Sequence, residues 1–142
     1  MALPQQKLRE IVLQLLYTQE FVEDEADEKI QMIMHELKIS KRSVQLAAEK
    51  AMAVQNKKEE IDPMIQKVST QYQLERIALV ERNILRLAIH EMILSKEVPP
   101  KVAIAEAIRL ARKFATPEAA SYVNAILDSL YVEKDGKNLA KT

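Results

Sequence analysis

The chain contains a single glycine, Gly136, among its 142 residues. Glycine most readily adopts the positive φ values of tight hairpin turns, and it allows the close backbone approach that nucleotide-binding loops need. A hairpin-rich β fold, a P-loop and a dinucleotide-binding loop are therefore all disfavoured. Aromatic residues make up only 4% of the chain and hydrophobic residues 48%, so the core must consist mainly of Leu, Ile, Val, Ala and Met, which suit packed helices.

The length of the chain fits one domain. A chain of 142 residues can bury roughly 70% of its unfolded surface, which is enough for a hydrophobic core. The sequence contains no internal repeat and no low-complexity linker. We therefore expect a single helical domain over residues 1–142, in which residues 132–142 form a frayed tail.

The charge balance restricts the possible partners. The formal net charge is +0, from 21 basic and 21 acidic residues, so any nucleic-acid site must be a local cluster of cations. Charged residues interrupt the N-terminus and no apolar run reaches membrane-spanning length, so we expect neither a signal peptide nor a membrane partner. The lack of cysteine is compatible with a reducing compartment, and we expect the protein to be cytoplasmic.

Apolar residues recur at helical spacing along most of the chain. This pattern predicts an all-α fold of about seven helices, over 8–16, 30–37, 44–54, a segment that starts at Asp62–Pro63, 74–92, 102–114 and 123–130. Three sets of residues predict helix boundaries: Ser40 or Ser43 as a cap, Pro99–Pro100 as the end of one helix and the start of the next, and Thr116–Pro117–Glu118 at the start of the last helix.

No catalytic motif is complete in the sequence. His35 and His90 are each followed by Glu, as in the zinc-protease motif HExxH, but Ile39 and Leu94 occupy the position of the second histidine. No glutamate precedes either histidine by three residues, as a ferritin-like metal site would require. We therefore predict no enzymatic activity, no catalytic residue, no metal and no cofactor.

Three segments of the C-terminal half resemble the NusB family. They are YQLERIALVERNILRLAIHEM at residues 72–92, VPPKVAIAEAIRLARKF at residues 98–114 and YVNAILD at residues 122–128. The second and third are similar to the family patterns P-x-K-V-A-I-N-E-A-I-x-L-A-K-x-F and F-V-N-G-V-L-D, and all three occur in the family's order and spacing. Arg9–Glu10 and Leu15–Leu16–Tyr17 match the family's first helix more loosely.

This resemblance implies an all-α fold of two packed three-helix units. It also implies that the chain binds the boxA element of nascent ribosomal RNA together with NusE, a small-subunit ribosomal protein. The resulting complex would join RNA polymerase as part of an antitermination assembly.

The resemblance assigns five residues to a candidate RNA face. Lys7 and Arg9 occupy the family's basic N-terminal segment, and three further residues match positions on its RNA face, namely Phe114, Glu118 and Tyr122. Single-stranded RNA is typically held by aromatic stacking, by basic contacts to phosphates and by N–H groups at a helix N-terminus. Phe114 and Tyr122 could instead be core aromatics.

Spacing adds three cations to the candidate RNA face. Lys101, Arg109 and Arg112 are separated by eight and three residues, so they fall near one stripe of the predicted helix. On the protein-binding side, the resemblance assigns Tyr17, Glu75 and Glu81 to the NusE-facing surface, where the carboxylates would meet basic groups. The alternative for both glutamates is an ordinary solvated helix charge.

The sequence departs from the family pattern at several positions. Gln5 and Gln6 stand where arginines are usual, Tyr72 replaces a frequent Trp, and Ala105 stands where Asn is common. Fewer N-terminal cations predict weaker and less salt-dependent binding of RNA by the chain alone. Ala125 replaces a glycine, which predicts a close helix contact filled by one methyl group.

Two other functions are compatible with the pattern. The first is the NusB-like accessory domain of some ribosomal RNA cytosine methyltransferases, against which the short chain argues because no cofactor-binding domain follows residue 142. The second is a helical scaffold that binds proteins and has lost RNA binding, which the small number of N-terminal cations permits.

Overall fold

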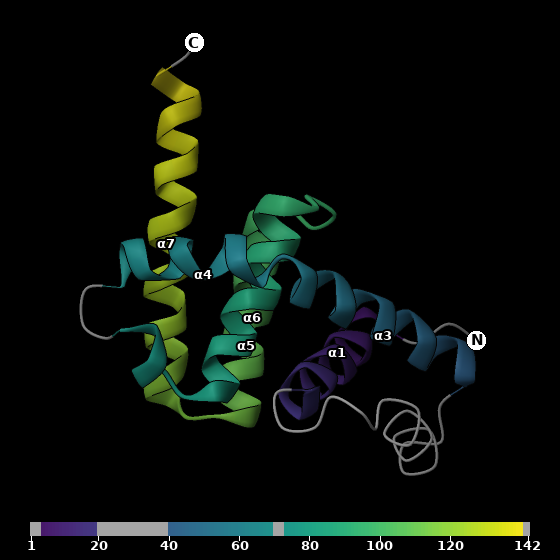
Figure 1. The fold of residues 1–142 in the computed structure, drawn as a ribbon. Coiled ribbons are helices and arrows are strands. Elements are labelled where there is room, and N and C mark those ends of the chain that lie inside the picture. Colours follow the sequence, from purple (N-terminus) through teal and green to yellow (C-terminus); the bar gives the residue numbers. More distant parts are fainter. Residues whose placement is uncertain (1–3, 20–39, 70–72, 141–142) are drawn as a thin grey trace. The chain divides into compact units, whose positions relative to one another are not determined.

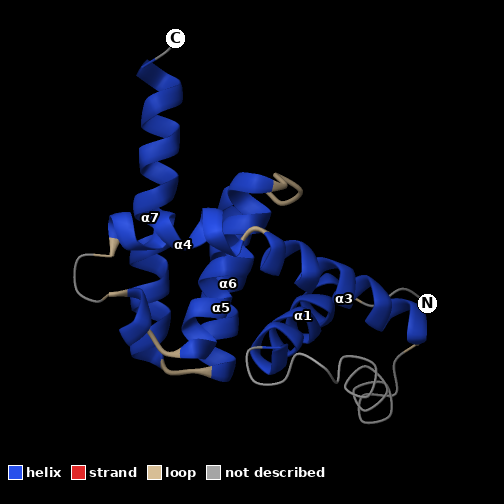
Figure 2. Ribbon diagram, viewed as in Figure 1, coloured by secondary structure: helices blue, strands red, loops and turns tan. Residues whose placement is uncertain are grey.

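The computed structural model describes residues 4–19, 40–69 and 73–140, and all regular elements in these ranges are helical, as Figure 2 shows. The described ranges hold α1 (Gln5–Gln19), α3 (Lys41–Asn56), α4 (Lys58–Val68), α5 (Leu79–Ile89), α6 (Pro100–Phe114) and α7 (Pro117–Ala140) (Figure 1). They also hold a 3-10 helix, η1 (Leu74–Arg76), and a π-helix, η2 (His90–Leu94). The predicted all-α fold is confirmed, and the helix expected over 30–37 lies outside the described residues.

The chain divides into two compact units, residues Met1–Asn56 and Lys57–Thr142. In the first unit α1 packs against α3, and in the second α4, α5, α6 and α7 pack against one another. No helix in the described ranges combines the length and the apolar character needed to cross a membrane.

The two described helices of the N-terminal unit follow their sequence patterns. The apolar residues predicted to form one face of α1 are all buried: Leu8, Ile11, Val12, Leu15 and Leu16. In α3 the buried apolar positions are Val44, Ala47, Ala51 and Val54, where small side chains allow close helix approach. The Ser40 hydroxyl accepts a hydrogen bond from the Ser43 N–H at 3.2 Å, so Ser40 caps α3.

The predicted start of α4 at Asp62–Pro63 is wrong. The helix begins at Lys58, where the Ile61 N–H donates to the Lys57 carbonyl at 2.9 Å, and Pro63 lies inside it. Proline has no N–H to offer the carbonyl four residues earlier, which here belongs to Glu59. Glu59 is in the exposed first turn, so water can satisfy its carbonyl and the helix tolerates the proline.

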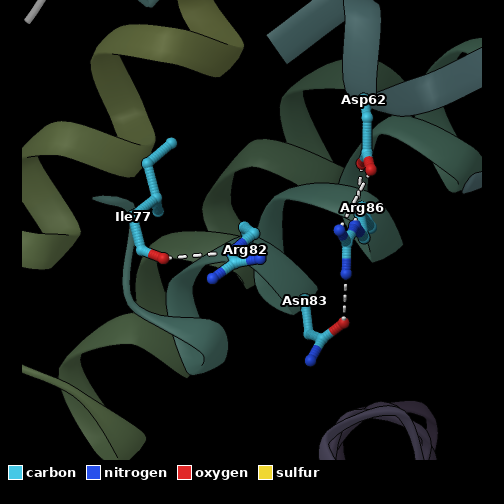
Figure 3. A network of polar contacts seen from close by, with 5 residues as sticks. All are labelled: Asp62, Ile77, Arg82, Asn83 and Arg86. Atoms are coloured by element: carbon cyan, nitrogen blue, oxygen red, sulfur yellow. Dashed lines mark hydrogen bonds and ion pairs between the residues drawn. The ribbon is translucent and has the colours of Figure 1, made fainter. Parts of the chain in front are cut away.

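The segment expected as one helix over 74–92 is divided into three. Ile77 and Ala78 have extended backbone between η1 and α5, with ψ values of 130° and 144°. The Ile77 carbonyl accepts a hydrogen bond from the Arg82 Nε at 3.0 Å, so a side chain of the next helix stabilises the break (Figure 3). Beyond Ile89 the helix continues as η2, in which the Ser95 N–H donates to the His90 carbonyl at 2.8 Å.

The prediction that Pro99–Pro100 end this helix is also wrong, because regular structure stops at Leu94 and Lys96 adopts a positive φ of 56°. The second half of that prediction is confirmed. Pro100 is the first residue of α6, and the Ala103 N–H donates to the Pro99 carbonyl at 3.0 Å.

An ion pair joins α4 to α5 beside the core of the C-terminal unit (Figure 3). Arg86 donates from Nε and Nη2 to the two carboxylate oxygens of Asp62, and from Nη1 to the Asn83 Oδ1 at 3.2 Å. The apolar neighbours of Arg86 in α5 are all buried: Ile84, Leu85, Leu87, Ala88 and Ile89. The bidentate pair compensates the charge that α5 carries into this apolar surrounding.

Candidate nucleic-acid interface

One face of α6 carries the predicted cations. At 100° per residue, Lys101, Arg109 and Arg112 fall within about 80° of one another around the helix axis. We call these three residues the α6 basic stripe. Lys101 and Arg112 are exposed, whereas Arg109 is half-buried and donates from Nε to the Glu106 Oε2 at 2.7 Å. Lys101 and Arg112 therefore present charge to solvent, while the charge of Arg109 is partly compensated within the helix.

An aromatic ring lies at the end of α6, before the turn to α7. Phe114 is the last residue of α6 and is half-buried, and the Lys113 Nζ lies 5.7 Å from the centre of its ring. This distance permits a cation–π contact. Phe114 thus retains an accessible surface beside one exposed cation, Lys113.

The predicted start of α7 is confirmed. The Thr116 Oγ1 accepts a hydrogen bond from the Ala119 N–H at 3.0 Å, and Pro117 is the first helical residue. Glu118 lies exposed in the first turn, and Tyr122 follows one turn later on the same side of the helix. The cap therefore fixes the part of α7 that holds both residues.

Tyr122 forms part of a groove between the end of α4 and α7. The groove has a volume of about 450 Å³ and is lined by Val68 and Ser69 and by one stripe of α7 between Glu118 and Ser129. We call it the α4/α7 groove. The Tyr122 hydroxyl and the Ser69 Oγ are 2.8 Å apart and share a hydrogen bond. Sequence reasoning missed Ser69, because nothing in the local pattern links two residues 53 positions apart.

Ala125 also lines this groove. The interpretation of its methyl group as filling a close helix contact is wrong, because Ala125 is exposed. Ala105, the other alanine that departs from the family pattern, is exposed on α6. Tyr72 lies outside the described residues.

The N-terminal unit holds the remaining candidates for RNA contact. Lys7 has 44% of its side chain exposed, and its Nζ lies 3.9 Å from the Glu10 Oε2. Arg9 is buried, with a relative exposure of 7%. Lys7 is therefore the better placed of the two predicted cations for a contact with a phosphate.

The predicted NusE-facing residues lie in both units. Tyr17, on α1, is a large exposed hydrophobic residue with a relative exposure of 38%. Glu75 is exposed in η1, and Glu81 is half-buried in the first turn of α5. Burial raises the pKa of the Glu81 carboxyl above its ordinary value, because desolvation penalises the charged form.

The chain is similar in sequence to known proteins over most of its length. A sequence model of the NusB family matches residues 6–132. A relative named transcription antitermination protein NusB, from Desulforamulus reducens, is 37% identical over 127 residues, covering 89% of each chain. A relative of the same name from Chlamydia pneumoniae is 33% identical over 130 residues, covering 92% of this chain and 81% of its own.

Solved structures agree with the sequence relatives. NusB of T. maritima aligns with a TM-score of 0.78 at 30% identity, covering 92% of both chains. A structure described as the antitermination factors NusB and NusE in complex with dsRNA aligns with a TM-score of 0.76 at 26% identity, covering 89% of this chain and 95% of that one. The family match, the relatives and the shared fold lead to one conclusion: the chain belongs to the NusB family.

Proposed function

We propose that this chain is a transcription antitermination factor that binds the boxA element of nascent ribosomal RNA together with NusE. In this role it joins the antitermination complex of RNA polymerase, in the cytoplasm, and acts by binding without catalysing a reaction. Two observations about relatives support the proposal: their name, and the description of one solved structure as NusB and NusE in complex with dsRNA.

The observation that carries the RNA part of the proposal is the combination of exposed cations and accessible aromatic rings on α6 and α7. Lys101 and Arg112 offer charge to phosphates, and Phe114 and Tyr122 are half-buried rather than enclosed in the core. Binding of single-stranded RNA commonly combines a basic track for the backbone with aromatic platforms for the bases. A chain with a formal net charge of +0 needs such a local cluster.

The NusE part rests on an exposed aromatic residue and on two carboxylates. Tyr17 is exposed, which suits an aromatic contact at a protein interface, and Glu75 and Glu81 would attract basic groups of the partner. Because NusE would add its own contacts to the RNA, the pair should bind boxA more tightly than this chain alone.

Fluorescence anisotropy with a labelled boxA-like RNA, with and without NusE, tests the proposal. The parent chain should bind weakly alone and tightly with NusE, and the double substitution Lys101→Ala/Arg112→Ala should weaken binding by about tenfold or more. Lys41→Ala/Arg42→Ala removes the same charge from exposed positions of α3 and is the matched control. If the complex does not bind the RNA, or if both double variants lose the same affinity, the proposed RNA role is wrong.

A further inference from the structure

The two carboxylates of the candidate NusE-facing surface lie on either side of a break in the chain. Glu75 is in η1, before the break, and Glu81 is in the first turn of α5, after it. The break consists of Ile77 and Ala78, whose backbone is extended, with ψ values of 130° and 144°. Its conformation therefore decides how the two carboxylates are directed relative to each other.

An unbroken helix would direct these carboxylates to different sides. At 100° per residue, side chains six positions apart point about 120° away from each other around the helix axis. Glu75 and Glu81 have this separation in the sequence. The extended residues between η1 and α5 remove the restriction, so the break determines whether one partner can contact both carboxylates.

The Ile77 peptide links η1 to α5. Its N–H donates to the Leu74 carbonyl at 3.1 Å, which closes the turn that contains Glu75. The Ile77 carbonyl accepts a hydrogen bond from the Arg82 Nε at 3.0 Å (Figure 3). The Arg82 N–H also donates to the Ala78 carbonyl, at 2.9 Å. Arg82 therefore holds the carbonyls of both extended residues, and through Ile77 it holds the turn of Glu75.

The start of α5 has no side-chain cap that could fix the break instead. Ala78 occupies the N-cap position and makes no side-chain hydrogen bond. Alanine is a poor N-cap residue, because its side chain has no oxygen to accept from the first N–H groups of the helix. Arg82 is half-buried, and its Nε provides the side-chain contact that the cap lacks. The conformation of the break thus depends on Arg82.

We propose that Arg82 is a positioning residue for the NusE-facing surface, which fixes η1 relative to the start of α5 so that Glu75 and Glu81 contact the same partner. This inference rests on the proposed binding of NusE, and it assigns a role to a residue that acts through the Ile77 carbonyl. The contribution of Glu75 to binding should depend on Arg82, whereas that of Glu81 should not, because Glu81 belongs to α5 itself.

Two neutral substitutions separate the hydrogen bond of Arg82 from its charge. The glutamine amide nitrogen follows the same run of side-chain carbons as the arginine Nε, so Arg82→Gln removes the charge and keeps a donor, whereas Arg82→Met removes both. In calorimetric titrations with NusE at neutral pH, Arg82→Gln should bind as the parent does and Arg82→Met about fivefold more weakly. Arg42→Met removes an exposed arginine of α3 and should leave the affinity unchanged.

The dependence of Glu75 on Arg82 is a readout that a general loss of stability would not produce. In the parent, Glu75→Gln and Glu81→Gln should each weaken NusE binding about fivefold. In the Arg82→Met background, Glu75→Gln should weaken it no further, whereas Glu81→Gln should keep its full effect. Equal effects of Glu75→Gln in the two backgrounds, or loss of both effects together, would contradict the proposal.

A serine at the N-cap separates stability from positioning. Ala78 is exposed, with φ and ψ values of −55° and 144°, so Ala78→Ser should cap α5 without strain. If Arg82→Met lowers the melting temperature, adding Ala78→Ser should raise it again, but the affinity for NusE should remain about fivefold below that of Arg82→Gln/Ala78→Ser. Recovery of the affinity together with the melting temperature would overturn the positioning role.

The outcomes distinguish this inference from the proposed function. If the glutamate variants weaken NusE binding but Arg82→Met binds as Arg82→Gln does, the surface is correct, and the buried Ile77 side chain fixes the break without Arg82. If Arg82→Gln is as weak as Arg82→Met, the charge of Arg82 matters and its hydrogen bond does not. Either result overturns the positioning role. If neither Glu75→Gln nor Glu81→Gln weakens binding, the NusE-facing surface itself is wrong and the inference fails with it.

Discussion

Arg86 donates to both carboxylate oxygens of Asp62, from Nε at 2.8 Å and from Nη2 at 3.0 Å, although only 3% of the Arg86 side chain is exposed. The two residues belong to different helices, α5 and α4, and are 24 positions apart. An arginine always carries its charge, so this buried guanidinium depends on its partner. The pair therefore fixes α4 against α5, and the end of α4 in turn supplies one side of the α4/α7 groove.

Removing the carboxylate should destabilise the fold. Asp62→Ala removes the carboxylate that pairs with the buried Arg86 charge, and loss of one member costs about 3–5 kcal/mol for fully buried pairs. Asp62 keeps 19% of its side chain exposed, so we expect the free energy of unfolding in urea to fall by about 3 kcal/mol. Glu60→Ala breaks the exposed Lys57–Glu60 pair and should cost less than about 1 kcal/mol. Equal losses for the two variants would show that the Arg86 charge does not depend on Asp62.

The core of the C-terminal unit should be sensitive to truncation at Leu85. This side chain has a relative exposure of 0%, so Leu85→Ala should lower the free energy of unfolding by about 2–5 kcal/mol. Leu46→Ala removes the same atoms from a position that is 47% exposed and should change it by about 0.5 kcal/mol or less. A melting temperature of Leu85→Ala within error of the parent would contradict the buried placement.

The helices with regular apolar spacing could be predicted from the sequence, and those with unusual backbone could not. The buried faces of α1 and α3 repeat every three or four residues, which is sufficient to identify a helix and its inward side. The break at Ile77–Ala78 depends on a side-chain hydrogen bond from Arg82, and no periodicity reports such a contact. The start of α4 was predicted wrongly because proline usually occupies the first turn of a helix. Here Pro63 lies inside the helix, which is tolerated because the carbonyl it leaves unbonded belongs to the exposed Glu59.

In the candidate site too, features that are local in the sequence could be predicted, and contacts between distant residues could not. The α6 basic stripe could be predicted, because its members share one face of one helix, and so could the Thr116 cap, which is local. Ser69 could not be predicted, since its contact with Tyr122 arises only when α4 and α7 pack. Arg86 did offer a signal that was not used: a cation within the apolar run of α5 indicates a buried partner.

Glu81 should make both stability and NusE binding depend on pH. Its raised pKa means that the folded state binds the proton more tightly than the unfolded state, so its contribution to stability is present below the ordinary value of 4.5 and is lost as pH rises through the folded pKa. Contact with a basic group of NusE favours the ionised carboxylate, so affinity should rise with pH over the same window.

Glu81→Gln should flatten both pH profiles, and Glu81→Lys should weaken NusE binding at every pH while leaving the melting temperature close to that of the parent. Calorimetric titrations between pH 4.5 and neutrality measure the affinity. Glu59→Lys reverses an exposed charge outside the predicted NusE-facing residues and is the control. A pH profile for Glu81→Gln that matches the parent would assign the titration to another group.

The two arginines of the α6 basic stripe should differ in the salt dependence that they contribute. Each phosphate contact with a single strand adds about 0.7 to the slope of log affinity against log salt concentration. Arg112 is exposed, so Arg112→Ala should lower this slope by about one contact. Arg109 is already paired with Glu106 at 2.7 Å, so Arg109→Ala removes a charge that Glu106 partly compensates, and the slope should fall by less.

Glu106→Gln removes the charge that pairs with Arg109 and should steepen the slope. If Arg109 faces no phosphate, the parent and Glu106→Gln would give equal slopes. Anisotropy titrations of the complex with NusE over a salt series measure all four proteins, and a larger fall for Arg109→Ala than for Arg112→Ala would reverse the assignment.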